Sequence, residues 1–141
     1  MRANEQIRRL KEVPLFAGLT VAELREVRRM ATELEFPATA HIVEQGASAS
    51  DFYLLLSGEA AVIESGRLKR HTLVPGDYFG EMSVIDGGPR TATIMALSPV
   101  VVLRLDSDTF DQLIATHSSI SRKMLVGMAQ RLRVSERSMS H

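Results

Sequence analysis

The sequence of 141 residues contains no cysteine and no tryptophan, and aromatic residues make up only 5% of it. Without cysteine the chain has no disulfide framework, no thiol nucleophile and no cysteine-ligated zinc site. It also lacks an excess of charge, because 17 lysine and arginine residues balance 17 aspartate and glutamate residues. The strong basic excess of a dedicated nucleic-acid-binding chain is therefore missing, and no nucleic-acid partner is expected.

Long apolar runs are absent as well. The longest, such as residues 53–56 and 99–103, are far too short to span a bilayer. Residues 1–11 alternate in charge and do not have the form of a secretory signal. We therefore expect a cytoplasmic, soluble domain without a membrane segment, and the length suits a single domain over residues 1–141.

Helical patterns flank a central region rich in turn signals. Thr20-Val21-Ala22-Glu23 has the form of a capping box, and apolar residues at helical spacing continue from Leu24 to about Leu34. This predicts a helical lead-in over residues 5–35. Apolar residues recur at helical spacing in two further segments, predicted as helices over about 107–116 and 119–139, which would make a C-terminal helix pair.

The central region, about residues 36–106, has the turn spacing of a β structure. Its glycines at 46, 58, 66, 76 and 87 recur at the interval typical of all-β sandwiches and barrels. Ser65-Gly66 and Pro75-Gly76-Asp77 are turn signals. Strands are predicted over residues 41–44, 52–56, 60–64, 71–74, 92–95 and 100–105. About eight short strands in all predict a mainly β fold, an eight-stranded jelly-roll β-barrel.

The residues that carry chemistry gather in one loop after the turn at residues 75–77. Gly80 and Glu81 precede a short apolar stretch, and a tight turn separates that stretch from Arg90 and Thr91. Such a loop offers an anion backbone N–H groups, a hydroxyl and a guanidinium, while the acid accepts a hydrogen bond from a neutral donor such as a sugar hydroxyl. A ligand that contains both phosphate and sugar fits this set.

Phe79-Gly80-Glu81-Met82-Ser83, followed by Pro89-Arg90-Thr91-Ala92, resembles the phosphate-binding cassette of the cyclic-nucleotide-binding domain. This domain is the sensor of the catabolite-activator family and of cyclic-nucleotide-dependent kinases and channels, and the resemblance extends from about Leu15 to Arg137. It implies that Glu81 accepts a hydrogen bond from the ribose 2′-hydroxyl and that Gly80 admits the sugar closely. It also implies that Met82 begins a short helix directed at the cyclic phosphate.

The remaining roles implied by the resemblance concern the phosphate and the base. Ser83 would add a donor, Arg90 would pair with the phosphate charge, and Thr91 would reach a phosphate oxygen or the purine. Arg131 and Ser135 would contact the base from the last helix, the hydroxyl being supplied by a dimer partner. That helix carries an a/d seam, and the seam packs either on its own domain or in a homodimer. The seam residues are Leu125, Met128, Leu132, Ser135 and Met139.

The resemblance implies a regulatory module that binds cAMP in preference to cGMP, catalyses no reaction and signals through its C-terminal helix. No metal or other cofactor is expected, because the histidines at 41, 71, 117 and 141 lack metal-ligand spacing. Two alternatives stay open: an interaction module of the same fold that has lost nucleotide binding, and a fragment of a DNA-binding regulator. Taken alone, Arg90 also fits a surface arginine paired with Asp86. The effector is unidentified, and the chain fits both a stand-alone sensor and a piece of a longer polypeptide.

Overall fold

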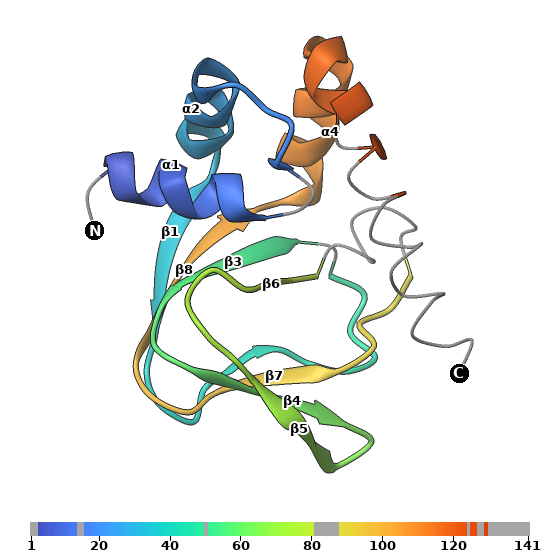
Figure 1. Ribbon diagram of the computed structural model, residues 1–141. Coiled ribbons are helices and arrows are strands. Elements are labelled where there is room, and N and C mark those ends of the chain that lie inside the picture. The colour runs from blue at the N-terminus through green and yellow to red at the C-terminus, as the bar shows by residue number, and fades with distance from the viewer. Residues whose placement is uncertain are drawn as a thin grey trace, which may run out of the picture. The chain divides into compact units, whose positions relative to one another are not determined.

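The structure is a computed structural model that describes residues 3–13, 16–49, 51–80, 88–123, 125–126 and 129 (Figure 1). The chain divides into two compact units. Residues 1–30 and 111–141 contribute to the helical unit, and residues 31–110 form the β unit. The assignment of the whole chain to a single domain stays a prediction.

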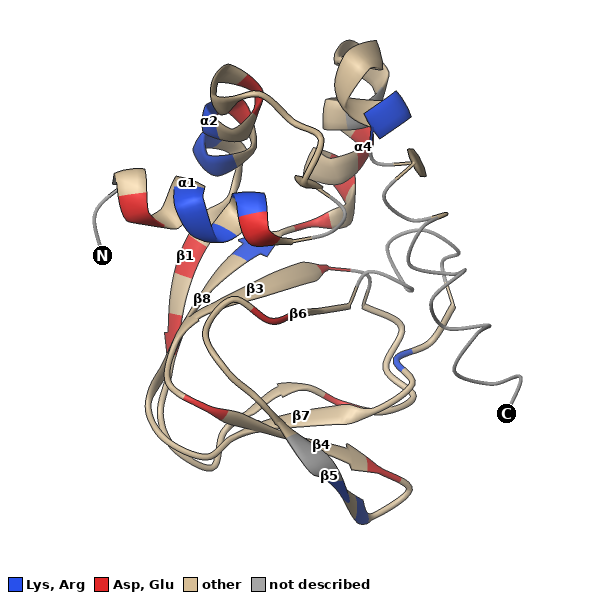
Figure 2. Cartoon of the chain, viewed as in Figure 1, with Lys and Arg blue, Asp and Glu red and all other residues tan. Residues whose placement is uncertain are grey.

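Helices α1 (Ala3–Glu12) and α2 (Val21–Met30) open the helical unit. The capping box predicted at the start of α2 is confirmed: the Thr20 N–H donates to Oε1 of Glu23 over 2.8 Å, and the Glu23 N–H donates to Oγ1 of Thr20 over 3.2 Å. Leu24 and Val27 are buried, and Figure 2 shows acidic and basic residues interspersed along both helices. Helix α2 therefore buries an apolar stripe and exposes charges of both signs.

The predicted continuation of this helix to about Leu34 is wrong, because α2 ends at Met30 and strand β1 (Thr32–Phe36) begins at once. Within β1, Leu34 and Phe36 are partly buried while the residues between and before them are exposed. This is the two-residue period of a strand. The strand pairs with β8 from Thr32↔Arg104 to Phe36↔Val100. Pairing in the sheet outweighs the helical spacing that Leu34 also satisfies.

The strands of the β unit form two four-stranded sheets among the described residues, in the orders β1-β8-β3-β6 and β2-β7-β4-β5. All of the strand pairings are antiparallel. The remaining strands are β2 (His41–Val43), β3 (Phe52–Ser57), β4 (Ala60–Glu64), β5 (Arg67–Leu73), β6 (Tyr78–Phe79), β7 (Thr93–Ala96) and β8 (Val100–Leu105). The mainly β fold expected from the sequence is thus confirmed, whereas the closed jelly-roll barrel stays a prediction.

A tight hairpin turn joins β4 to β5. Ser65 has φ 50° and Gly66 has φ 77°, and two positive φ values in succession are what a two-residue type I′ turn requires. Because this turn places Glu64 opposite Arg67, β5 starts at Arg67. The predicted start of this strand at residue 71 is therefore too late.

Side chains from both sheets meet in one hydrophobic core. Tyr53, Leu55 and Phe79 come from one sheet, and Ile94 and Ala96 come from the other. Strand β3 is buried along almost its whole length, so the side chains on both of its faces are removed from water. Burial of these apolar surfaces holds the two sheets together and fixes the strand ends that carry the site.

Helix α4 (Ser107–Thr116) begins and ends where the sequence predicted it. Asp106 caps it, because Oδ1 accepts the N–H of Thr109 over 2.7 Å. Helical residues continue over 118–123 and at 125, 126 and 129. Leu125 is exposed, and the other predicted seam residues lie outside the described residues. Within the described part of the chain, no helix is long and apolar enough to cross a membrane.

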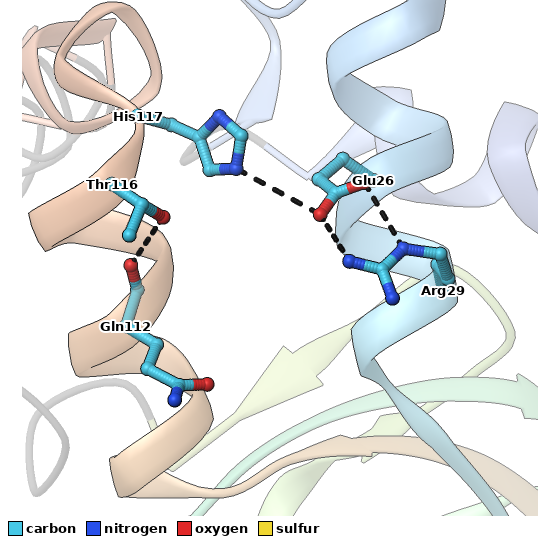
Figure 3. A network of polar contacts seen from close by, with 5 residues as sticks. All are labelled: Glu26, Arg29, Gln112, Thr116 and His117. Atoms are coloured by element: carbon cyan, nitrogen blue, oxygen red, sulfur yellow. Dashed lines mark hydrogen bonds and ion pairs between the residues drawn. The ribbon is translucent and has the colours of Figure 1, made fainter.

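Polar contacts connect the helices of the helical unit (Figure 3). Glu26 of α2 accepts a hydrogen bond from Nε of Arg29 over 3.1 Å, and its Oε1 lies 3.7 Å from Nε2 of His117. Arg29, followed by His117, holds the pKa of the Glu26 carboxyl below its usual value. These contacts join α2 to the junction between α4 and the helical residues after it.

Candidate functional site

The structure describes three of the six residues that the sequence assigned to the phosphate-and-sugar site. Gly80 directly follows β6, and Arg90 and Thr91 lie shortly before β7. Glu81, Met82 and Ser83 lie outside the described residues, as do Arg131 and Ser135 of the last helix. The described part of the site is therefore built around Arg90.

Arg90 is buried, with 4% of its surface exposed. Its Nη2 donates to the backbone carbonyl of Asp51 over 2.8 Å, and its Nη1 donates to the carbonyl of Gly80 over 3.3 Å. Arg90 and Gly80 are thus brought together as expected. The alternative that Arg90 is a surface arginine is wrong, and Asp86, its supposed partner, lies outside the described residues.

A single loop also holds the main chain of Arg90. The N–H of Gly46 donates to the Arg90 carbonyl over 2.8 Å, and the N–H of Arg90 donates to the Ala47 carbonyl over 3.0 Å. The Asp51 carbonyl accepts a hydrogen bond from the side chain of Arg90. Residues within 44–51 therefore contact Arg90 at both its backbone and its guanidinium. We call residues 44–51 the clamp loop; residue 50 in it is not among those described.

The protein's own backbone and the neighbouring residues require a glycine at position 80. Its φ is 89°, in the left-handed region that favours glycine. A Cβ added there would lie 2.4 Å from the carbonyl oxygen of Asp51 and 2.7 Å from Nη1 of Arg90. Any side chain at this position would therefore push against the clamp loop and the guanidinium. The close approach of a sugar to Gly80 stays a prediction.

An aromatic pair lies beside the guanidinium. The Arg90 Cζ lies 6.0 Å from the centroid of the Tyr53 ring, at the outer limit of a cation–π contact. Tyr53 stacks on Phe79 with ring centroids 5.1 Å apart and an interplanar angle of 14°. Burial, and then the nearby charge of Asp51, raise the pKa of the Tyr53 phenol. The hydroxyl therefore stays protonated at neutral pH.

Asp51 connects two arginines through different atoms. Its backbone carbonyl accepts from Arg90, while its carboxylate Oδ2 lies 4.0 Å from Nη1 of Arg104. Arg104 lies in β8, directly opposite Tyr53 of β3. This arrangement fixes the end of the clamp loop against the sheet.

Sequence reasoning missed Asp51, Tyr53, Gly46 and Ala47 as parts of the site. Three of them act through main-chain groups, and a main-chain contact leaves no trace in residue type. Tyr53 lies in the apolar run predicted as a strand, where an aromatic side chain is an ordinary core residue. Its ring is in fact both a core residue and a neighbour of Arg90.

The geometry suits an anionic ligand. The carbonyls of Asp51 and Gly80 orient the guanidinium of Arg90, and a guanidinium can form charge-assisted hydrogen bonds to a phosphate. Thr91, next to it, is exposed and places a hydroxyl residue beside this charge. Among the described residues, no group of three or more His, Cys, Asp or Glu side chains could hold a metal ion.

Comparisons with known proteins indicate the family of the chain. A family model described as "Cyclic nucleotide-binding domain" matches residues 33–117. The cAMP-dependent protein kinase regulatory subunit of Aspergillus fumigatus is 36% identical over 117 residues, covering 81% of this chain and 28% of that protein. The cGMP-dependent protein kinase isozyme 1 of Drosophila melanogaster is 35% identical over 130 residues, covering 86% of this chain and 17% of that protein. The chain thus spans less than a third of the length of these relatives.

Solved structures show the same fold. The N-terminal domain of a transcriptional regulator from Streptomyces coelicolor superposes with a TM-score of 0.83 at 27% identity, covering 94% of each chain. The catabolite activator protein of Thermus thermophilus gives a TM-score of 0.77 at 27% identity, covering 90% of this chain and 62% of that one. Both similarities extend over nearly all of the present chain.

Proposed function

The chain belongs to the cyclic nucleotide-binding domain family, and on that premise we propose that it is a regulatory module that binds cAMP in preference to cGMP. The observation that carries the proposal is the buried guanidinium of Arg90, oriented by the carbonyls of Asp51 and Gly80. In the proposed complex this guanidinium pairs with the cyclic phosphate. The chain's own role is to bind the nucleotide, with no chemical step.

The other ligand contacts are proposed from the sequence pattern. Glu81 accepts the ribose 2′-hydroxyl, and the residues from Met82 direct backbone N–H groups at the phosphate. Ser83 adds a donor, and Thr91 reaches the phosphate or the purine. Gly80 supports these contacts, because its lack of a side chain leaves room for Arg90 and Asp51 at the same point.

The preference for cAMP has support from the names of relatives. The Aspergillus fumigatus relative is named for cAMP dependence, and the Drosophila relative, of similar identity, is named for cGMP dependence. Because several fungal relatives of similar identity are also named as cAMP-dependent regulatory subunits, cAMP is the preferred ligand of the proposal.

The proposed output is the C-terminal helix. Arg131 and Ser135 contact the base, so that occupancy fixes the helix, either on its own domain or in a homodimer. Switching follows if the ligand contacts the helix in one state more than in the other. A jelly-roll arrangement of the sheets, a single domain over residues 1–141 and a cytoplasmic location complete the proposal. The effector is a kinase or another protein domain.

Thermal unfolding with and without nucleotide tests this function. At a concentration about 100 times its dissociation constant, cAMP stabilises the folded protein by roughly 2.7 kcal/mol. For a chain of this size, this raises the midpoint by on the order of 10 °C. The expected order of the response is cAMP, then cGMP, with no response to 5′-AMP.

Two variants serve as the comparison. Arg90→Ala removes the guanidinium, and its midpoint should no longer respond to cAMP. Arg67→Ala removes an exposed arginine of β5 and should respond as the wild type does. If neither cyclic nucleotide shifts the midpoint of wild-type protein freed of retained ligand, the proposal is wrong and an interaction module that has lost nucleotide binding takes its place.

A further inference from the structure

The clamp loop that holds Arg90 is itself tied to two other elements of the β unit through one residue. Gln45 immediately precedes Gly46, whose N–H donates to the Arg90 carbonyl. Its backbone N–H donates to Oγ1 of Thr93 in β7 over 3.0 Å. Its side-chain Oε1 accepts the N–H of Ser65 over 2.7 Å, and its Nε2 lies 3.4 Å from Oγ of Ser65.

Side-chain packing around Gln45 and Gly46 is sparse. Gln45 and Gly46 are both exposed, and a Cβ added to Gly46 would meet no atom within 4 Å. Hydrophobic packing therefore contributes little here, and directional hydrogen bonds set the position of the backbone. The hydrogen bonds of Gln45 lie one residue away from the bond between the Gly46 N–H and the Arg90 carbonyl.

Ser65, the partner of the Gln45 side chain, lies in a conformationally restricted turn. Ser65 and Gly66 form the two-residue turn of the β4–β5 hairpin, with both φ values positive. Such a turn is fixed by the register of the two strands it joins. Glu64 pairs with Arg67 on either side of it, so Ser65 offers its N–H from a defined place.

We propose that Gln45 is a positioning residue for the anion site. By joining the clamp loop to the hairpin turn and to β7, it fixes the backbone register of Gly46 and Ala47, and through them the position of Arg90. Gln45 itself does not contact the ligand. The inference rests on the proposed function for its effect on nucleotide affinity, whereas its effect on the clamp loop is independent of any ligand.

The substitution Gln45→Met tests the proposal, because methionine keeps the length of the side chain and removes the acceptor for Ser65. We expect the affinity for cAMP, measured by isothermal titration well below the unfolding midpoint, to fall about tenfold, as for the loss of one ordering hydrogen bond. Ser65→Ala keeps the N–H that Gln45 binds and should stay within about twofold of the wild type.

Ser98→Ala is the matched control for general loosening of loops. Oγ of Ser98 accepts the N–H of Glu59 over 3.1 Å. This bond lies beside the Ala60↔Ala96 pair, at the opposite end of the β4–β7 ladder from Ile63↔Thr93. Ser98→Ala should lower the unfolding midpoint and leave the cAMP affinity unchanged. Equal affinities for Gln45→Met and Ser98→Ala would overturn the proposal.

A second measurement needs no ligand. In Gln45→Met we expect the backbone amides of Gly46 and Arg90 to exchange with solvent at least about tenfold faster than in the wild type, because the two backbone hydrogen bonds between Arg90 and the clamp loop open more often. In Ser98→Ala they should exchange at the wild-type rate. Unchanged exchange in Gln45→Met would refute the positioning role. If Gln45→Met exchanges faster but the wild-type protein binds no cyclic nucleotide, only the proposed function is refuted, and the positioning role of Gln45 stands.

Discussion

Lys123 donates a 2.8 Å hydrogen bond from Nζ to Oε1 of Glu23, the same oxygen that accepts the N–H of Thr20. One carboxylate therefore caps helix α2 and also binds the helical residues that follow α4. Lys123 and then Thr20 lower the pKa of Glu23 from 4.5 to about 2. The stem of Lys123 also packs near Gly18, where an added Cβ would lie 3.6 Å from the lysine Cβ.

The depressed pKa of Glu23 predicts a loss of stability in acid. A carboxyl whose pKa is lower in the folded state stabilises the protein above its unfolded pKa, and this contribution is lost as the pH falls toward the folded value. The difference in unfolding free energy between wild type and Glu23→Gln should be about 1–2 kcal/mol at pH 7. It should shrink between pH 5 and pH 3, as followed by urea unfolding.

Lys123→Met should reproduce part of this difference, because it removes the first cause of the lowered pKa of Glu23. The control is Lys69→Met, which breaks an exposed pair with Glu64 at 3.2 Å and should cost no more than about 0.5 kcal/mol. If the Glu23→Gln difference were as large at pH 3 as at pH 7, the ionised carboxylate would not be its source.

Gly80→Ala should both destabilise the protein and weaken nucleotide binding. The new methyl group meets the carbonyl of Asp51 and the guanidinium of Arg90, so the clamp loop or the arginine has to move. Gly66→Ala is the matched control, since Gly66 also has a positive φ but has open space around it. We expect a cost of about 1 kcal/mol for Gly66→Ala and 2–3 kcal/mol or more for Gly80→Ala.

Chemical unfolding measures those costs, and cAMP titration separates the two effects. Only Gly80→Ala should lower the affinity, because only its methyl group reaches Arg90. Equal costs and equal affinities for the two alanine variants would show that the close contacts at Gly80 relax without consequence.

The Tyr53 ring, rather than its hydroxyl, should matter to the site. Tyr53→Phe keeps the stack on Phe79 and the ring near Arg90, so its cAMP affinity should stay within about threefold of the wild type. Tyr53→Leu removes the ring and should destabilise the fold by about 1–3 kcal/mol, since the residue is part of the core between the sheets. A tenfold loss of affinity in Tyr53→Phe, measured by calorimetry, would instead assign the hydroxyl a role in binding.

The cap of α4 is a test of local structure alone. Asp106 accepts the N–H of Thr109, and this bond is the first cause of its lowered pKa. Asp106→Ala should lower the free energy of unfolding by about 1 kcal/mol, while Asp106→Asn, which also caps well, should lose little. The unfolding midpoints of the two variants in urea provide the comparison, and equal midpoints would argue against the cap.

Much of the β unit could be read from local signals in the sequence. The turn at Ser65-Gly66 and the strand over Ala60–Glu64 follow from residue types whose backbone preferences are strong. By contrast, the sequence predicts helix for the start of β1, because Leu34 fits a helical period as well as an alternating one. Strand β6 contains only Tyr78–Phe79, which is too short for any periodicity to be detected.

The site was predictable to the extent that side-chain chemistry defines it. The meeting of Gly80 and Arg90 follows from a pattern of residue types. The clamp loop does not, because Gly46, Ala47 and Asp51 contact Arg90 through main-chain groups that every residue possesses. Long-range backbone pairing of this kind is set by the tertiary fold and leaves no local signature.

The clamp loop contacts Arg90 through main-chain groups, and this determines which substitutions, insertions and deletions the loop tolerates in evolution. Ala47 and Asp51 contribute carbonyl oxygens to Arg90, so side-chain replacements at these positions leave the acceptors in place. Inserting or deleting one residue between them would displace the Asp51 carbonyl by about 3.3 Å, more than the tolerance of a hydrogen bond. Homologous chains that bind the same ligand should therefore vary in side chain at the positions of Ala47 and Asp51 while keeping the length of this loop.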